Sequence, residues 1–170
     1  MIIGVVSDTH DNQEAARRAA RLLVERGAEL VLHLGDIVAP FTLRRFSEER
    51  VKRLIAVYGN NCGERLGLQR VAASLGYEIH EWPYTVEIAG RRILMLHGTG
   101  PAEKTRGFVE ALAASGRYDA VLYGHTHEVD VRRIGSTLVL NPGEACGCLT
   151  GRKTIALLDT EAMEAEILEI

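Results

Sequence analysis

The sequence predicts an α/β fold, and three observations carry that prediction. Short apolar runs alternate with segments of helical spacing through the first half of the chain, which is typical of a parallel sheet. The second half changes to pairs of apolar runs separated by short turns, which indicates hairpins. Apolar residues make up 46% and charged residues 25% of the 170 residues, as in globular domains. No linker or repeat divides them, so we expect one domain over residues 1–170 with mixed sheets.

The first half of the chain supports this prediction element by element. Ile2 to Ser7 is a short apolar run, as expected for a strand buried on both faces. Asp11 or Asn12 can cap a helix that runs to about Arg26, where a glycine suits its end. The alternation continues with a strand at 30–34, a helix at 41–47, a strand at 51–58 and a helix at 64–75 that is closed by a glycine.

Hairpins dominate the second half. Ala89-Gly90 lies between the first pair of predicted strands, and Gly135-Ser136 lies between the second pair. The predicted elements are a hairpin at 85–88 and 92–97, a helix at 103–114, a strand at 118–123, a hairpin at 129–134 and 137–140, and a hairpin at 154–158 and 163–168.

Composition excludes several classes of protein. The 20 basic and 23 acidic residues leave a net charge of −3, so nucleic acid is not an expected partner except as a substrate fragment. No apolar run reaches the ~18 residues of a membrane span. Met1 to Val6 is too short for a signal peptide and lacks a basic leader. Three cysteines, an odd number, argue against a disulfide framework and favour a cytoplasmic location.

Five short polar segments follow predicted strands. They are 7–10, 35–36, 59–61, 97–98 and 124–127. The carboxyl ends of strands form the binding crevice of an open α/β sheet, so these segments can deliver their side chains to one place. Imidazoles together with hard oxygens suit divalent Mn, Zn, Ni or Fe. Two ions can be held if one carboxylate bridges them, and the candidate ligands are Asp8, His10, Asp36, Asn60, His97, His125 and His127.

Each segment alone has a plainer interpretation. Asp8 and His10 can be a helix cap and a surface histidine. Gly35-Asp36 and Gly59-Asn60 can be ordinary turns. His125 and His127 can occupy one face of a strand. The five segments in this order and spacing nevertheless favour a metal centre over five independent coincidences.

The ordered set D-x-H, G-D, G-N, H-G and G-H-x-H resembles the calcineurin-like metallophosphoesterases, in particular their small phosphodiesterase branch. Asn141-Pro142-Gly143 is similar to a turn typical of that branch, so the resemblance runs from residue 8 to residue 143. It implies a four-layer αββα sandwich of two mixed sheets flanked by helices. It also implies two metals, one held by Asp8, His10 and His127, the other by Asn60, His97 and His125, with Asp36 as the bridge.

The resemblance implies an enzyme, a metal-dependent phosphodiesterase that acts on a small phosphodiester. Two divalent ions can clamp a phosphate and lower the pKa of a bridging water from ~15.7 to near 7, so that hydroxide attacks phosphorus. The expected cofactors are two ions of Mn, Ni, Zn or Fe. The residues expected to take part in catalysis are Asp36, Asn60 and His97.

Three departures from the family pattern mark candidate substrate contacts. Asn61 stands where related phosphatases carry a histidine acid, and an amide cannot transfer a proton. Thr99 replaces the last residue of a common H-G-H. Glu144 follows the glycine of the N-P-G turn, where serine is common. A Glu144 carboxylate that faces the site would disfavour dianionic monoesters, whereas one that points to solvent would have no such effect.

Two other functions remain open from the sequence. A phosphomonoesterase or nucleotidase would use the same site. A scaffold similar to the retromer subunit of this fold would bind proteins, but such scaffolds typically lose metal ligands, and all seven are present here. Apolar residues at predicted sheet edges favour a homodimer. His33 lies within a predicted strand, and we expect it in the core or behind a metal ligand.

Overall fold

The computed structural model describes residues 1–170 as eleven strands and four helices. The strands are β1 (Ile2–Val6), β2 (Leu30–His33), β3 (Leu54–Val57), β4 (Glu78–His80), β5 (Tyr84–Ile88), β6 (Arg91–Met95), β7 (Ala120–Leu122), β8 (Val129–Ile134), β9 (Thr137–Pro142), β10 (Thr154–Asp159) and β11 (Glu164–Glu169). The helices are α1 (Gln13–Glu25), α2 (Pro40–Glu48), α3 (Arg65–Leu75) and α4 (Ala102–Ala114).

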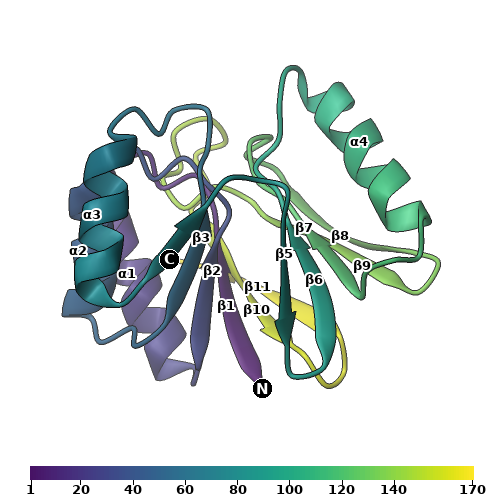
Figure 1. Cartoon of the computed structure of the whole chain (residues 1–170), viewed down its shortest axis with the longest axis horizontal. Coiled ribbons are helices and arrows are strands. Elements are labelled where there is room, and N and C mark those ends of the chain that lie inside the picture. The colour runs from purple at the N-terminus through teal and green to yellow at the C-terminus, as the bar shows by residue number, and fades with distance from the viewer.

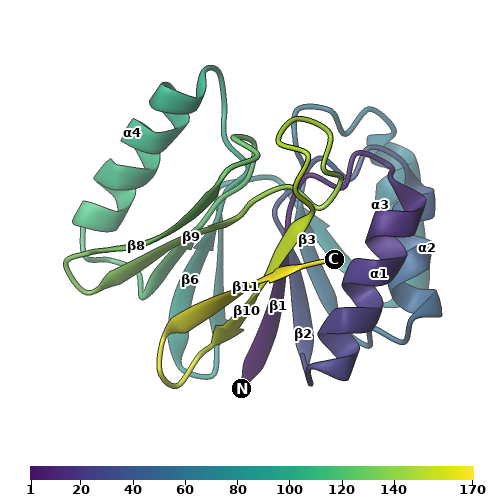
Figure 2. The same cartoon turned by 180° about the vertical axis from the view of Figure 1, so that it is seen from behind.

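Two sheets pack face to face, and helices cover their outer faces (Figure 1). One sheet has the strand order β11-β10-β1-β2-β3-β4, and the other has the order β5-β6-β7-β9-β8. Helices α1, α2 and α3 cover the first sheet, while α4 covers the second (Figure 2). Both sheets contain parallel and antiparallel pairs. This architecture confirms the four-layer αββα sandwich expected from the sequence.

Apolar side chains fill all three spaces between the layers. Val5, Leu32 and Met95 belong to the buried cluster between the two sheets. Leu23 and Phe46 belong to the cluster between the first sheet and its helices. A third, smaller cluster lies beneath α4. Because β1, β2 and β3 are buried on both faces, they contain almost no polar side chains until they end.

Local sequence signals place the ends of the helices. Asn12 caps α1, since its side chain accepts a hydrogen bond from the backbone N–H of Ala15 at 3.1 Å. Gly76 ends α3 with a φ of 70°, a left-handed conformation that glycine adopts without a steric penalty. No helix of the chain is both long and apolar enough to span a membrane.

Strands β3 and β4 differ most from the sequence prediction. Strand β3 begins at Leu54 rather than near residue 51, although the Arg53 carbonyl still accepts a hydrogen bond from the Val31 N–H at 3.0 Å. Strand β4 was not predicted because it has only three residues and pairs along one side alone, with β3. Its existence depends on that long-range pairing rather than on a local pattern.

Candidate metal centre

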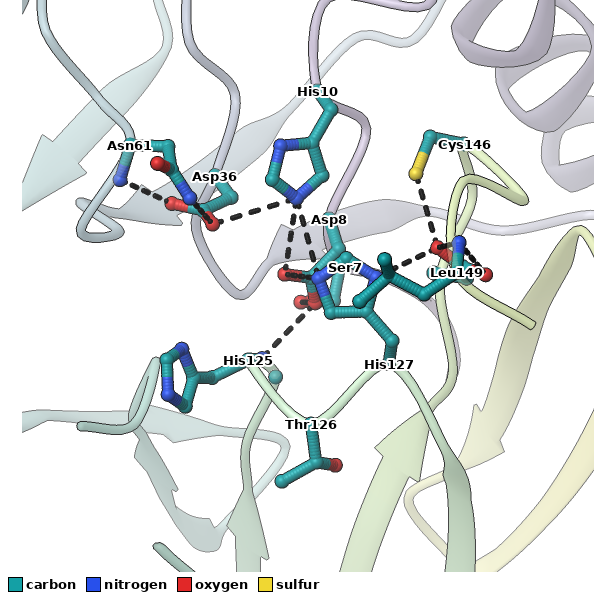
Figure 3. A network of polar contacts seen from close by, with 12 residues as sticks. Ser7, Asp8, His10, Asp36, Asn61, His125, Thr126, His127, Cys146 and Leu149 are labelled. Atoms are coloured by element: carbon teal, nitrogen blue, oxygen red, sulfur yellow. Dashed lines mark hydrogen bonds and ion pairs between the residues drawn. The ribbon is translucent and has the colours of Figure 1, made fainter. Parts of the chain in front are cut away.

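Polar side chains converge where five strands end, and Asp8, His10, Asp36, His125 and His127 are labelled among them in Figure 3. The loops after β1, β2 and β3 come from one sheet, and the loops after β6 and β7 come from the other. Parallel pairing within each sheet directs these carboxyl ends the same way. The structure thus brings together all the candidate ligands of the sequence: Asp8, His10, Asp36, Asn60, His97, His125 and His127.

The first group of ligand atoms comes from Asp8, His10, His127 and Asp36. His127 Nε2 lies 3.3 Å from Asp8 Oδ1 and 3.3 Å from His10 Nε2. His10 Nε2 lies 3.5 Å from Asp36 Oδ2. Ligands about 2.0–2.2 Å from a tetrahedral ion are about 3.4 Å from one another. These four side chains therefore have the spacing required to share one divalent ion.

Asp8 supplies an independent reason to expect a cation. Its Oδ2 accepts hydrogen bonds from the Ser7 hydroxyl at 2.5 Å and from the His125 N–H at 3.1 Å. Its Oδ1 is buried and has no hydrogen-bond partner. An unsatisfied buried polar atom costs about 1–3 kcal/mol, and more when it carries charge. A cation beside Oδ1 would remove that cost.

The second group lies next to the first. Asn60 Oδ1 is 2.9 Å from His97 Nε2 and 2.9 Å from His125 Nδ1. His97 Nε2 also lies 3.4 Å from Asp36 Oδ2, the same oxygen that faces His10. One carboxylate oxygen of Asp36 is thus shared by the two groups. This is the position that a bridging ligand of two ions requires.

Hydrogen bonds at the outer nitrogen orient three of the four histidine rings. His97 Nδ1 lies 2.7 Å from the Leu34 carbonyl, and His125 Nε2 lies 2.7 Å from the Gly100 carbonyl. His127 Nδ1 lies 2.6 Å from Glu144 Oε2. Such partners direct the other ring nitrogen, unprotonated, toward a metal.

The electrostatics keep the shared carboxylate charged. Burial alone would raise the pKa of Asp36, but hydrogen bonds from His97 and Asn61 hold it well below its usual range. The Asp8 carboxylate, whose Oδ1 lies 3.7 Å from His10 Nε2, raises the pKa of His10 against the opposing effect of burial. Burial lowers and Asp36 raises the pKa of His97, with a net upward shift. The centre attracts protons when no metal is bound, so we expect metal binding to release them.

The chain is similar in sequence to known phosphoesterases. The family model of the calcineurin-like phosphoesterase superfamily domain matches residues 1–163. The chain belongs to the calcineurin-like phosphoesterase superfamily. It is 40% identical over 165 residues to phosphodiesterase MJ0936 of Methanocaldococcus jannaschii, and the match covers 96% of each chain.

Two solved structures show the same fold. A structure described as a novel archaeal phosphodiesterase superposes with a TM-score of 0.90 at 37% identity, and all of both chains is covered. Vps29 of Chaetomium thermophilum superposes with a TM-score of 0.70 at 17% identity, with 100% of this chain and 93% of that chain covered. At that identity the likeness to Vps29 shows the shared fold alone.

In this phosphoesterase the backbone of the ligand loops is strained. Residues other than glycine rarely adopt a positive φ, and such residues cluster at functional sites. Here the candidate ligands with φ between 42° and 69° are Asp8, His10, Asp36, His125 and His127. The surrounding packing holds these conformations, and they turn the side chains of successive loop residues toward the centre.

His33 lies behind the ligands, as the sequence predicted. Its Nδ1 accepts a hydrogen bond from the Gly35 N–H at 3.3 Å, and its Nε2 lies 3.1 Å from the Thr9 hydroxyl. That hydroxyl donates in turn to the Asp36 carbonyl at 3.4 Å. Complete burial lowers the pKa of His33 to about 3, so it is neutral and braces the backbone that carries Asp36.

The three candidate substrate contacts lie in different surroundings. Asn61 is exposed, and its side-chain N–H donates to Asp36 Oδ2 at 2.7 Å. Thr99 is exposed at the start of the loop before α4, next to the glycine whose carbonyl holds His125. Glu144 is fully buried.

The position of Glu144 corrects the expectation for this residue. Its carboxylate faces neither substrate nor solvent, because it is enclosed behind His127 by the residue 145–150 loop. Glu144 is therefore not a substrate contact. Its contact with His127 was missed, and the one available signal was a carboxylate at a position where a small serine is common.

Proposed function

We propose that this phosphoesterase hydrolyses small phosphodiesters with two divalent ions held by its seven converging ligands. The observation that carries the proposal is the shared oxygen of Asp36, which lies 3.5 Å from His10 Nε2 in one group and 3.4 Å from His97 Nε2 in the other. Two ions bound there would supply a clamp for the phosphate and an activated water. The nitrogen and oxygen donor set is compatible with Mn, Zn, Ni or Fe.

The residues around the two ligand groups also suit a small anionic substrate. His10 is partly exposed and Asn61 is exposed, and both lie beside Asp36, so a phosphate could reach this side of the centre. The neutral amide of Asn60 limits the negative charge that an anionic substrate meets. The preference for diesters is supported by the relative that is 40% identical, which is named a phosphodiesterase, and by the absence of a histidine acid at position 61.

A direct test compares metal-free protein with protein reloaded with Mn²⁺. We expect about two ions per chain by elemental analysis, hydrolysis of a bis-aryl phosphodiester only after reloading, and a higher kcat/KM for the diester than for the matching aryl monoester. A higher kcat/KM for the monoester would assign the phosphomonoesterase function instead. Two bound ions without turnover of either substrate would favour the protein-binding scaffold.

Leaving groups provide a second prediction. Because Asn61 cannot donate a proton, we expect the rate to fall steeply as the pKa of the leaving alcohol rises. Asn61→His would supply a donor with a pKa near 6.5 and is expected to accelerate alkyl diesters by about tenfold or more over Asn61→Ala. The alanine variant is the control, since it also loses the hydrogen bond from the side chain of residue 61 to Asp36 but adds no acid. A rate that is independent of the leaving group, with chemistry rate-limiting, would contradict this prediction.

A further inference from the structure

Glu144 contacts the outer side of a proposed metal ligand. It is fully buried, and its Oε2 lies 2.6 Å from His127 Nδ1. The other nitrogen of the same ring, Nε2, faces Asp8 and His10. A carboxylate at Nδ1 keeps the proton on that nitrogen and leaves Nε2 as a free electron pair.

The same carboxylate closes a loop around itself. Backbone N–H groups of Cys148, Leu149 and Thr150 donate to its oxygens at 2.8, 3.0 and 2.5 Å. The Thr150 hydroxyl donates at 2.8 Å and the Cys146 thiol at 3.2 Å. Only a carboxylate anion can accept from all of these donors and from His127 at once, so its hydrogen-bonding capacity is used in full.

Hydrogen bonds also join this loop to the segment after β1 that carries Asp8 and His10. The Ala145 N–H donates to the Ser7 carbonyl at 3.0 Å, and the Cys146 N–H donates to the Asp8 carbonyl at 3.1 Å. The Asn12 side chain donates to the Cys146 carbonyl at 3.2 Å. In Figure 3, Cys146 and Leu149 lie on the other side of His127 from Asp36 and Asn61. Glu144 thus contacts both the His127 ring and the residue 145–150 loop, and that loop in turn contacts the backbone of Asp8.

We propose that Glu144 is a positioning residue, which holds His127 with Nδ1 protonated and Nε2 free for the ion. The inference rests on the proposed function only in assigning His127 to a metal. A carboxylate that served merely to close the loop would need the backbone donors but not the bond to His127. Conversely, a neutral side chain cannot accept from the ring and from every loop donor at once.

Glu144→Gln provides the first arm of the test, with Thr150→Val as the matched control. The glutamine must turn its NH₂ group either toward His127 Nδ1 or toward the Leu149 and Thr150 donors, and in both orientations a neutral amide holds the ring less firmly than a carboxylate does. We expect its Zn²⁺ affinity, measured by competition with a chelating dye, to fall by about 10- to 100-fold. The valine removes one donor to Glu144 and leaves the His127 bond intact. It is expected to raise amide hydrogen exchange in the loop but to keep Zn²⁺ affinity within about twofold.

Nitrogen NMR of the histidine rings in metal-free wild-type protein provides the second arm, which does not depend on any variant folding. We expect the proton of His127 on Nδ1. A proton on Nε2 would overturn the proposal, as would an unchanged affinity in Glu144→Gln or an equal loss in both variants. Wild-type protein that binds no metal would instead refute the proposed function, and the ring tautomer would still test the contact with Glu144.

Discussion

Asp36→Asn is expected to reduce diester hydrolysis by at least about 1,000-fold while the fold is retained. The asparagine keeps the shape of the side chain but removes the negative charge from the oxygen shared by the two ligand groups. Two cations held close together repel each other unless an anion lies between them. Loss of one ion removes several kcal/mol of transition-state charge stabilisation, which corresponds to that factor.

The measurement combines elemental analysis for metal content with kcat for a bis-aryl diester. Asp159→Asn is the matched control, because this aspartate pairs with Ile2 at the end of β1 that is opposite to the ligand loops. The control is expected to hold two ions and to turn over normally. An Asp36→Asn protein that retained two ions and full turnover would show that Asp36 is not the bridge.

Gly59→Ala is expected to lower kcat/KM by at least about 100-fold. A Cβ atom at this position would overlap the backbone nitrogen and Oδ1 of Asp36, and a backbone atom cannot move aside as a flexible side chain can. The loops after β2 and β3 would have to separate, which displaces both Asp36 and Asn60. A displacement of about 1 Å in a catalytic group is enough for a loss of this size.

Gly63→Ala is the control for this substitution, since it lies in the same loop and its added Cβ would meet nothing within 4 Å. We expect it to retain activity and to have a free energy of unfolding equal to or slightly above wild type. Diester kinetics and urea unfolding of both variants provide the comparison. Equal activity in the two variants would mean that the loops after β2 and β3 tolerate separation.

The types and positions of the ligands could be predicted because the signals are local. Asp8 and His10 directly follow an apolar run, and so do Gly35-Asp36 and Gly59-Asn60. A buried strand contains few polar side chains, so the first polar residues after it mark its end and the edge where ligands can gather. The alternation of elements predicted the parallel part of the first sheet by the same reasoning.

The position of Glu144 could not be predicted in this way. Its neighbours in sequence, Pro142 and Gly143, define a turn but give no direction for the next side chain. That direction follows from the contact of the residue 145–150 loop with the carbonyls of Ser7 and Asp8, more than 130 residues earlier in the chain. Strand β4 escaped prediction for a related reason, because only its pairing with β3 makes it a strand.

By itself, the sequence determined the α/β class, the ends of most elements, and seven candidate ligands with the chemistry to bind divalent ions. Each of these depends on residue type and short-range spacing. The tertiary structure alone decided that Asp36 presents one oxygen to both ligand groups and that Glu144 holds His127 rather than a substrate. Both facts are distances of a few ångströms between segments far apart in the chain, and packing of the two sheets and their loops sets such distances.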